Sequence, residues 1–350
     1  MKKILIYAPS LPKNWLHDTE VRDSYYDPHI YLRERLWELG YLLENFDNQP
    51  LENYEWVLFF EAENVQSTFK ERFIRYLKAK IKRHLVPLDL YGECVRAGME
   101  QRIALFLWEA PAVSPRNWNP ELHKLFPLIF TWHDDYVDGR KFIKIHWPQT
   151  RQFPEMPNIP FSQRKLLVNI SMNKYSHHSR ELYSARRDAI RYFERKYPDN
   201  FDLFGFMWDT SPTLLKQCLP WMHRSYPSYR GIVKNKWDVM PYYRFSICYE
   251  NMRDEPGYVT EKIFDSMRCG CVPIYWGAPN IEDYVDADAF IDRRQFKTNE
   301  KLDGYLSNMT QHEYERFQDA IRSYLAGPRF AKFLPTAYAD TIINTLKLNV

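Results

Sequence analysis

One segment of the sequence, residues 245–277, combines acidic, basic, amide and phenol side chains around a predicted helix start. An apolar run is followed by a polar loop, and Thr260 then precedes a helix expected over residues 261–269. The free N–H groups and the positive dipole end of such a helix favour a phosphate. Lys262 in the first turn is unfavourable for the helix alone, which suggests that an anion neutralises it. Glu261 can accept two hydroxyl hydrogen bonds, as from a ribose.

The same residues also fit a simpler arrangement. Thr260 is a good N-cap residue, so its hydroxyl can cap the helix while Glu261 and Lys262 form a solvated pair. Gly270 is a natural helix stop, and the apolar positions of the helix fall on one face that can pack on a sheet. Because caps of this kind are common, spacing alone leaves both interpretations open.

Glu109 is a second candidate for a residue with a chemical role. It directly follows an apolar run, residues 103–108, and precedes a turn that contains Pro111. A lone carboxylate at the end of a buried strand gains proton affinity by desolvation, as a general base requires. Glu61 follows residues 56–60 in the same local context, so strand position alone equally allows a surface glutamate.

The elements that must position these residues follow from short apolar runs that alternate with helical patterns, which predicts α/β units with parallel sheets. The first half shows strands at residues 4–8, 56–60, 103–108, 128–131 and 142–145, and helices at 31–39 and 68–85. A proline-rich linker is predicted at residues 148–162. The second half shows strands at residues 166–170, 202–206, 245–249 and 272–276, and helices at 180–196 and 261–269. The tail, residues 313–348, is predicted to form two helices.

Two stretches, FSICYEN at residues 245–251 and GYVTEKIFDSMRCGCVPIYWG at residues 257–277, resemble the donor-binding segment of the α-1,3/4-fucosyltransferases, glycosyltransferase family 10. GIVKNKWDVMPYYR at residues 231–244 extends the similarity in the manner of bacterial members. The resemblance implies that the asparagine, tyrosine and lysine of this segment contact the diphosphate and fucose of GDP-fucose, and that the glutamate holds the ribose. The implied donor-binding residues are Asn251, Tyr258, Glu261 and Lys262.

The resemblance also implies an arginine near the diphosphate on the first helix of the donor domain, where a planar, always-charged guanidinium suits a leaving diphosphate. Arg186 is the first choice, by its distance from the apolar positions Ile190 and Phe193. Arg187 is the alternative, and either arginine can equally be a solvated helix residue. Further candidates for donor contacts are Arg187, Lys234, Glu250 and Thr260.

FLWEAPAVSP at residues 106–115 resembles the family segment whose glutamate is the general base, although Ala110 stands where many members carry asparagine. The implied reaction is an inverting single displacement, in which Glu109 takes the proton of a glycan hydroxyl that attacks the anomeric carbon of GDP-fucose. An α-1,3 linkage to GlcNAc or Glc is expected. The alternatives are transfer of another GDP-linked deoxysugar and a non-catalytic relative that binds only carbohydrate or nucleotide.

Two doubly wound halves joined by a linker predict the GT-B fold class, with two Rossmann-like domains facing a central cleft. The expected N-terminal, acceptor-binding domain is residues 1–155, with acceptor contacts from loops such as residues 14–26. The expected GDP-sugar-binding domain is residues 156–335. Residues 336–350 are expected to form a C-terminal helix that can pack back on the N-terminal domain.

No metal is expected at the site. Asp286 and Asp288 spell a DxD motif, but they lie beyond the donor segment in a predicted loop, which favours exposed aspartates. Residues 133–135 (His-Asp-Asp) could suggest a metal site, but adjacent residues of a chain rarely bind one metal unless other ligands are present. Lys262, an arginine and helix N–H groups can carry the leaving-group charge. No cofactor is therefore expected, and a divalent metal would at most stimulate the reaction.

The composition restricts the classes of protein to which the chain can belong. The formal charge of +3, from 48 basic and 45 acidic residues, is too balanced for a dedicated nucleic-acid binder. Five cysteines without metal-ligand spacing are expected to be reduced and mostly buried. No apolar stretch reaches the ~20 residues of a membrane span. Together with the resemblance to bacterial members of the family, this composition leads us to expect a cytoplasmic enzyme of bacterial glycan biosynthesis, such as that of lipopolysaccharide.

The basic amphipathic helix predicted at residues 68–85 has two interpretations. It fits a solvated surface of a domain, and it also fits a peripheral contact with the anionic inner face of a bacterial membrane. A lipid-linked glycan acceptor, as opposed to a free oligosaccharide, would favour the membrane contact.

Overall fold

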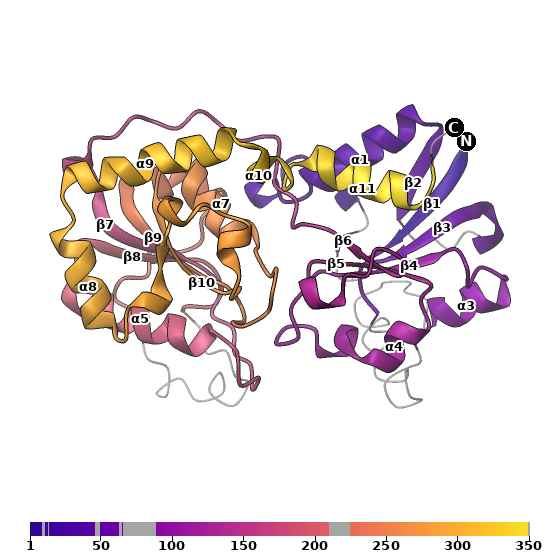
Figure 1. The fold of residues 1–350 in the computed structure, drawn as a ribbon, viewed down its shortest axis with the longest axis horizontal. Helices are drawn as coiled ribbons and strands as arrows, with labels where there is room; N and C mark the ends of the chain where they lie inside the picture. Colours follow the sequence, from indigo (N-terminus) through magenta and orange to yellow (C-terminus); the bar gives the residue numbers. More distant parts are fainter. Residues whose placement is uncertain are drawn as a thin grey trace. The chain divides into compact units, whose positions relative to one another are not determined.

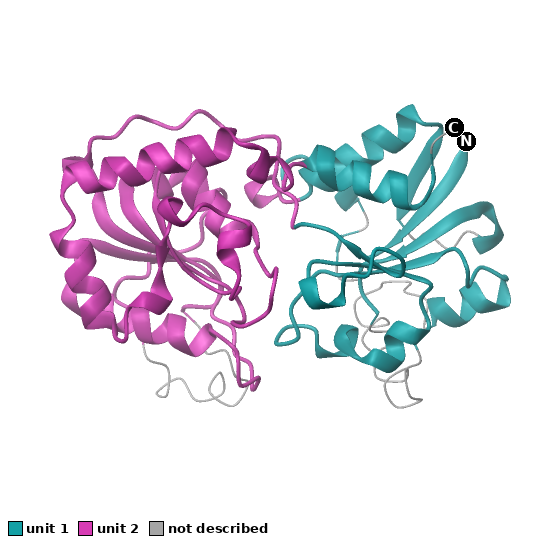
Figure 2. Ribbon diagram, in the orientation of Figure 1, with its two compact units in different colours: residues 1–20, 26–146, 335–350 teal, residues 21–25, 147–334 magenta. Residues whose placement is uncertain are grey.

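The structure is a computed structural model that describes residues 1–8, 11–12, 14–45, 50–62, 65, 89–209 and 225–348. The chain forms two compact units, both discontinuous in sequence (Figure 1, Figure 2). Unit 1 comprises Met1–Glu20, Tyr26–His146 and Pro335–Val350, and unit 2 comprises Val21–Tyr25 and Trp147–Leu334. The predicted helix at residues 68–85 and Cys218 lie outside the described residues.

Unit 1 is built on a parallel sheet. Its strands are β1 (Lys2–Tyr7), β2 (Tyr41–Asn45), β3 (Tyr54–Phe59), β4 (Ile103–Leu107), β5 (Leu128–Thr131) and β6 (Phe142–Lys144). They pair in the order β2-β1-β3-β4-β5-β6. On one face of the sheet lie α1 (Asp27–Glu38) and α11 (Pro335–Thr345), and over the other lie α3 (Leu90–Arg96) and α4 (Pro120–Lys124) (Figure 1).

The strands of unit 1 form where apolar runs can be buried on both faces, as parallel sheets require. The predicted run at residues 103–108 forms β4, which is buried throughout. The other predicted strands of this half are confirmed as β1, β3, β5 and β6. The sequence does not predict β2, because this short edge strand has a mixed pattern and is only partly buried.

Unit 2 is built on a second parallel sheet. Its strands are β7 (Lys165–Ile170), β8 (Phe201–Phe204), β9 (Tyr243–Tyr249), β10 (Val272–Trp276) and β11 (Ile291–Asp292). They pair in the order β11-β10-β9-β7-β8. On one face of the sheet lie α7 (Glu261–Arg268) and α9 (Gln311–Ala326), and on the other lie α5 (Tyr183–Lys196) and α8 (Asn299–Asn308) (Figure 1). The predicted strands and both predicted helices of this half are confirmed, whereas β11 and α8 are not predicted.

The strand order of unit 2 reverses between β7 and β9. The chain starts in the sheet at β7, adds β8 on one side, and then returns to add β9 on the other side. The following helices, α5 and α7, therefore cover opposite faces of the sheet (Figure 1). In open α/β sheets, ligands bind at the carboxyl ends of the strands at such a reversal. A ligand site is therefore expected among the residues that follow β7 and β9.

The tail contains α9, a short α10 (Pro328–Ala331) and α11, where the sequence predicts two helices. α9 begins with a capping box, in which Thr310 and Glu313 satisfy each other's backbone N–H groups. α10 and α11 each begin with a proline, whose missing N–H is not needed at a first helical position. α11 packs against α1 in unit 1, where the Tyr338 hydroxyl lies 2.9 Å from Nδ1 of His29.

The described cysteines, Cys94, Cys248, Cys269 and Cys271, are free and buried, as expected. Burial raises the pKa of the Cys94 and Cys248 thiols to about 12, so both are protonated at neutral pH. These side chains act as small apolar groups of the two cores.

Gly205 marks the place where the chain after β8 approaches the chain after β7. Its φ of +121° lies in a region that favours glycine, and a Cβ there would collide with the carbonyl oxygen of Ser171. The Ser171 N–H donates to the carbonyl of Phe204 at 3.0 Å, which holds the two segments together. Glycine is therefore required at this position.

We predict that Gly205→Ala lowers the free energy of unfolding of unit 2 by about 2–4 kcal/mol, through backbone strain and overpacking. Gly304→Ala, inside α8, is the matched control, since its added Cβ would meet no atom within 4 Å and its φ is helical. This control should raise stability by about 1 kcal/mol, because alanine is the better helix former. Urea unfolding followed by circular dichroism measures both changes, and equal effects of the two substitutions would contradict the close approach.

Candidate functional site

The candidate site lies at the carboxyl end of β9 and the start of α7, beside the strand reversal in unit 2. Glu250 follows β9 directly, and Thr260 occupies the N-cap position of α7. The Glu250 N–H donates to the carbonyl of Trp276 at 2.8 Å, so the chain is still paired with the end of β10 at this point. α7 is held in place by its apolar face, because Ile263 and Met267 are buried in the core of unit 2.

The Glu250 carboxylate organises the start of α7. Its side chain is fully buried and accepts hydrogen bonds from the Thr260 N–H and the Thr260 hydroxyl, both at 2.8 Å. It also accepts from Nζ of Lys262 at 3.0 Å, and this ammonium donates to Oγ1 of Thr260 at 2.9 Å. Burial alone would lower the pKa of Lys262, but the carboxylates of Glu250 and Glu261 raise it above its ordinary value. Lys262 therefore stays charged.

Two sequence interpretations are decided at this point. Thr260 holds the predicted N-cap position, but its side chain does not cap the helix, because it accepts no hydrogen bond from a backbone N–H of the first turn. The hydroxyl donates a hydrogen bond to the Glu250 carboxylate instead. The anion that neutralises Lys262 is likewise a carboxylate of the chain itself. Gly270 does end the helix, with a φ of 71° just after the C-cap residue Cys269.

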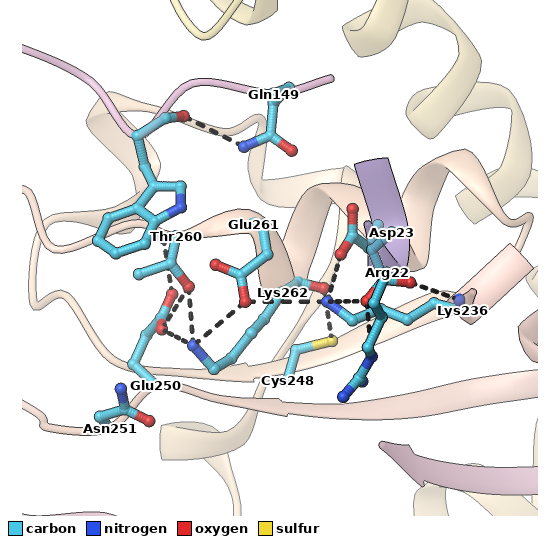
Figure 3. Close-up of polar contacts among 12 residues, drawn as sticks. Arg22, Asp23, Gln149, Lys236, Cys248, Glu250, Asn251, Thr260, Glu261 and Lys262 are labelled. Atoms are coloured by element: carbon cyan, nitrogen blue, oxygen red, sulfur yellow. Dashed lines mark hydrogen bonds and ion pairs between the residues drawn. The ribbon is translucent and has the colours of Figure 1, made fainter. Parts of the chain in front are cut away.

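Glu261 lies between two ammonium groups (Figure 3). Its Oε1 atom is 3.8 Å from Nζ of Lys262 and 3.8 Å from Nζ of Lys236. Burial alone would raise the pKa of Glu261, but these two charges hold it at about 2. The side chain is 28% exposed, so an ionised acceptor for hydrogen bonds remains accessible at neutral pH.

Asn251 and Tyr258 come together beside Glu250. Nδ2 of Asn251 donates to the Tyr258 hydroxyl oxygen at 3.3 Å. Tyr258 is buried, and its carbonyl accepts from the Tyr275 hydroxyl at 3.1 Å. Asn251 is half-buried, and its carbonyl accepts from the N–H of Leu182 just before α5. Four predicted donor-binding residues, Asn251, Tyr258, Glu261 and Lys262, thus surround the junction of β9 and α7.

The two candidate arginines differ in their surroundings. Arg186 on α5 is buried, and its Nη2 donates to the carbonyls of Tyr249 at 2.5 Å and Glu250 at 3.0 Å. Its guanidinium therefore holds the end of β9. Arg187 is half-buried and turns away from this strand, donating to the carbonyl of Lys174 at 2.7 Å. Donor contact by either arginine stays a prediction, as it does for the exposed Lys234.

Sequence reasoning misses two residues of this network, Lys236 and Asp23. Nζ of Lys236 lies 2.5 Å from Oδ2 of Asp265, in addition to its approach to Glu261. The Lys236 N–H donates to Oδ1 of Asp23 at 2.7 Å, across 213 positions in sequence. Lys236 lies in the stretch 231–244 that carries the family resemblance, which is the one signal that points to it. The sequence around Asp23 offers no comparable signal.

Glu109 belongs to unit 1, where it follows β4. Its side chain is half-buried, and its carbonyl accepts from Nε1 of Trp118 at 2.7 Å. The neighbouring Trp108 packs among aromatic rings, with centroid separations of 6.2 Å to His29 and 5.9 Å to Tyr338. The strand end that carries Glu109 is thus held by α1 and by α11 of the tail.

The remaining polar motifs have structural partners. Asp286 forms an ion pair with Arg329, and Asp134 forms one with Lys144 at 2.6 Å. Within the described part of the chain, no cluster of His, Cys, Asp or Glu side chains could hold a metal ion. None of the helices in the described ranges combines the length and the apolar character needed to cross a membrane.

Comparison with known families gives a match over the candidate site. Residues 222–326 match the family described as "Glycosyltransferase family 10 (fucosyltransferase) C-term". An α-(1,3)-fucosyltransferase of Helicobacter pylori is 35% identical over 81 residues, which are 23% of this chain and 17% of that protein. An α-(1,4)-fucosyltransferase of Arabidopsis thaliana is 39% identical over 71 residues, which are 20% of this chain and 18% of that protein. The matches thus span less than a fifth of the length of these relatives.

Solved structures match the whole chain at low identity. A crystal structure of an α1,3-fucosyltransferase covers 99% of this chain and 90% of its own, with 14% identity and a TM-score of 0.56. The structure of Anabaena HepE in complex with UDP-glucose covers 99% of both chains, with 12% identity and a TM-score of 0.51. At such identities the likeness concerns the fold, and together with the two doubly wound sheets it confirms the GT-B fold class.

We predict that Glu250→Gln lowers the free energy of unfolding by about 3 kcal/mol, because it leaves the Lys262 ammonium without its closest counter-charge. Asp319→Asn is the matched control, since it neutralises one partner of an ion pair in which both side chains are highly exposed. The control should change stability by less than about 0.5 kcal/mol. Urea unfolding of both variants measures the difference, and a Glu250→Gln variant as stable as the control would contradict the organising role of this carboxylate.

Proposed function

We propose that the whole chain is an inverting fucosyltransferase that moves L-fucose from GDP-fucose to a glycan hydroxyl, since residues 222–326 match the C-terminal part of glycosyltransferase family 10. The supporting observation is the position of the ionised Glu261 and Lys262 at the start of α7, within the matched segment. The named relatives support the same donor, and one similar fold was solved with GDP-fucose.

The donor would bind with its diphosphate at the start of α7 and its ribose on Glu261. The N–H groups of the first turn and the ammonium of Lys262 supply positive charge for the diphosphate. Lys262 would then divide its hydrogen bonds between Glu250 and the phosphate oxygens, since an ammonium group has three donors. Asn251 and Tyr258 are proposed to contact the diphosphate and fucose, and Arg186 adds a charge behind the end of β9.

The proposed reaction is a single displacement at the anomeric carbon. The acceptor hydroxyl attacks this carbon, Glu109 takes the hydroxyl proton, and GDP leaves with the bonding electron pair. Lys262 and the helix N–H groups stabilise the charge that develops on the diphosphate, without a metal ion in this proposal. The proposed acceptor is a free or lipid-linked oligosaccharide, with an α-1,3 linkage formed to GlcNAc or Glc. The relatives and solved structures named as α-1,3-fucosyltransferases support this linkage.

Calorimetric titration of the EDTA-treated protein with GDP, GDP-fucose, GDP-mannose and UDP-galactose tests the donor. We expect GDP and GDP-fucose to bind without metal and UDP-galactose to give no heat. Binding of GDP without preference for the fucose conjugate would favour transfer of another GDP-linked deoxysugar. Absence of any guanine-nucleotide binding would contradict the proposed donor site.

Two substitutions separate donor binding from catalysis. Glu109→Gln should lower turnover by about 10²-fold or more while GDP affinity stays unchanged, because it removes only the base. Lys262→Ala should weaken GDP binding by about tenfold or more, because it removes a charged donor to the diphosphate. Initial rates of fucose transfer and calorimetry with GDP measure the two effects.

Glu61→Gln is the matched control for Glu109, since Glu61 follows β3 in the same local context. The control should keep the turnover of the wild type. Wild-type turnover in Glu109→Gln would exclude this residue as the base.

A further inference from the structure

A short segment of the N-terminal half, Val21–Tyr25, belongs to unit 2, although the residues before and after it belong to unit 1. The sequence assigns this segment to a loop that contacts the acceptor, whereas the structure packs it beside the proposed donor site. Arg22 lies over the ring of Phe206, with the guanidinium carbon 4.9 Å from the ring centroid. The segment is therefore part of the surroundings of the site in unit 2.

The backbone of this segment is strained. Asp23 and Ser24 have φ angles of 56° and 50°, in the left-handed region that residues other than glycine rarely adopt. Such conformations persist where surrounding contacts impose them, and they concentrate at functional sites. The contacts of Asp23 identify what imposes the conformation here.

Asp23 is held by a reciprocal pair of hydrogen bonds. Its N–H donates to Oδ1 of Asn235 at 3.3 Å, and its own Oδ1 accepts from the N–H of Lys236 at 2.7 Å. Its second carboxylate oxygen lies 3.2 Å from Nε of Arg22 and 4.0 Å from Nζ of Lys236. Asp23 thus fixes the backbone of Lys236 and also faces its charge.

Lys236 connects Asp23 to Glu261. Its side chain is 13% exposed, and its ammonium lies 3.8 Å from Glu261 and 4.0 Å from Asp23 (Figure 3). The same ammonium lies 2.5 Å from Asp265. Burial alone would lower the pKa of Lys236, but these three carboxylates raise it above its ordinary value. One buried ammonium therefore faces three carboxylates. Of these, only that of Glu261 is proposed to contact the donor.

The two lysines beside Glu261 have different roles when a donor binds. Lys262 has Glu250 as its main partner and faces the proposed diphosphate position, so a bound diphosphate competes for it. Lys236 is held by Asp23 and Asp265, neither of which is proposed to contact the donor. Lys236 is therefore the charge that keeps Glu261 ionised and oriented while Lys262 contacts phosphate.

We infer that Asp23 and Lys236 are positioning residues, which hold the Glu261 carboxylate for recognition of the ribose hydroxyls of a guanosine diphosphate donor. This inference rests on the proposed function, since it requires a ribose at Glu261. A hydrogen bond to a charged acceptor contributes about 1.5–3 kcal/mol, roughly 10- to 150-fold in affinity, when its geometry is held. Removal of Asp23 or Lys236 should therefore weaken the recognition of the ribose hydroxyls. The affinity that the diphosphate contributes should stay.

The test compares GDP with 2′,3′-dideoxy-GDP, which lacks both ribose hydroxyls, by calorimetry on the full chain. The wild type should prefer GDP by about tenfold or more, as expected for charged hydrogen bonds. In Asp23→Ala and Lys236→Met, the preference should fall several-fold, because GDP binds less tightly while 2′,3′-dideoxy-GDP binds as before. A merely structural loss would weaken both nucleotides equally.

Asp254→Ala is the matched control. Asp254 is another aspartate of unit 2 with a left-handed φ, 61°, and it pairs with Arg253 and not with Lys236. This variant should keep the wild-type preference for GDP. Because Lys236→Met removes the shared counter-charge of three carboxylates, Asp23→Ala decides the test if the lysine variant does not fold.

The outcomes separate this inference from the proposed function. If the wild type prefers GDP and Asp23→Ala keeps the full preference, the positioning role is wrong and the donor proposal stands. If the wild type binds both nucleotides equally, Glu261 does not recognise the ribose, and the positioning role is again wrong. If the wild type binds neither nucleotide, both proposals are overturned.

Discussion

The buried carboxylate of Glu250 is the interaction on which the site of unit 2 depends. A carboxylate without access to water must be matched by donors and by positive charge, and Glu250 obtains them from the Thr260 N–H, the Thr260 hydroxyl and Lys262. These bonds tie the end of β9 to the start of α7. Arg186 ties the same strand end to α5 through two carbonyls. Gly277 completes the junction, because a Cβ there would collide with the Glu250 side chain. The end of β9 and the start of α7 are thus joined to α5, 63 positions earlier in the chain, at the strand reversal.

From Glu250 the charges alternate across the site, through Lys262, Glu261 and Lys236 to Asp265 and Asp23. This alternation gives each member a partner of opposite charge and removes the electrostatic disadvantage of a lysine in the first helical turn. It also gives the proposed function a physical basis, since Lys262 could share its hydrogen bonds between Glu250 and a diphosphate. Because these charged groups hold one another in place, the proposed donor binding would require little reorganisation.

Unit 1 depends on a different kind of contact. Its strand ends are packed by aromatic rings, with Trp108 against both His29 of α1 and Tyr338 of α11. Burial lowers the pKa of His29 to about 3, so this imidazole stays neutral and acts as a packing and hydrogen-bonding group. The proposed base Glu109 is attached to this rigid strand end. Both units are completed by remote segments of the chain, unit 1 by residues 335–350 and unit 2 by residues 21–25.

The sequence by itself determined the local features: the apolar strands of both sheets, the position of α7, the stop at Gly270, and the resemblance that singled out Asn251, Tyr258, Glu261 and Lys262. These features depend on residues close together in the chain. The sequence does not predict β2 and β11, because these two edge strands are short and only partly buried. Only the tertiary structure decided that the Thr260 hydroxyl binds Glu250, that Arg186 holds strand carbonyls, and that Asp23 supports Lys236. The physical reason is that a side chain satisfies its hydrogen bonds and charge with whatever partners the fold brings near. For Asp23 that partner is 213 positions away, beyond the reach of any local pattern.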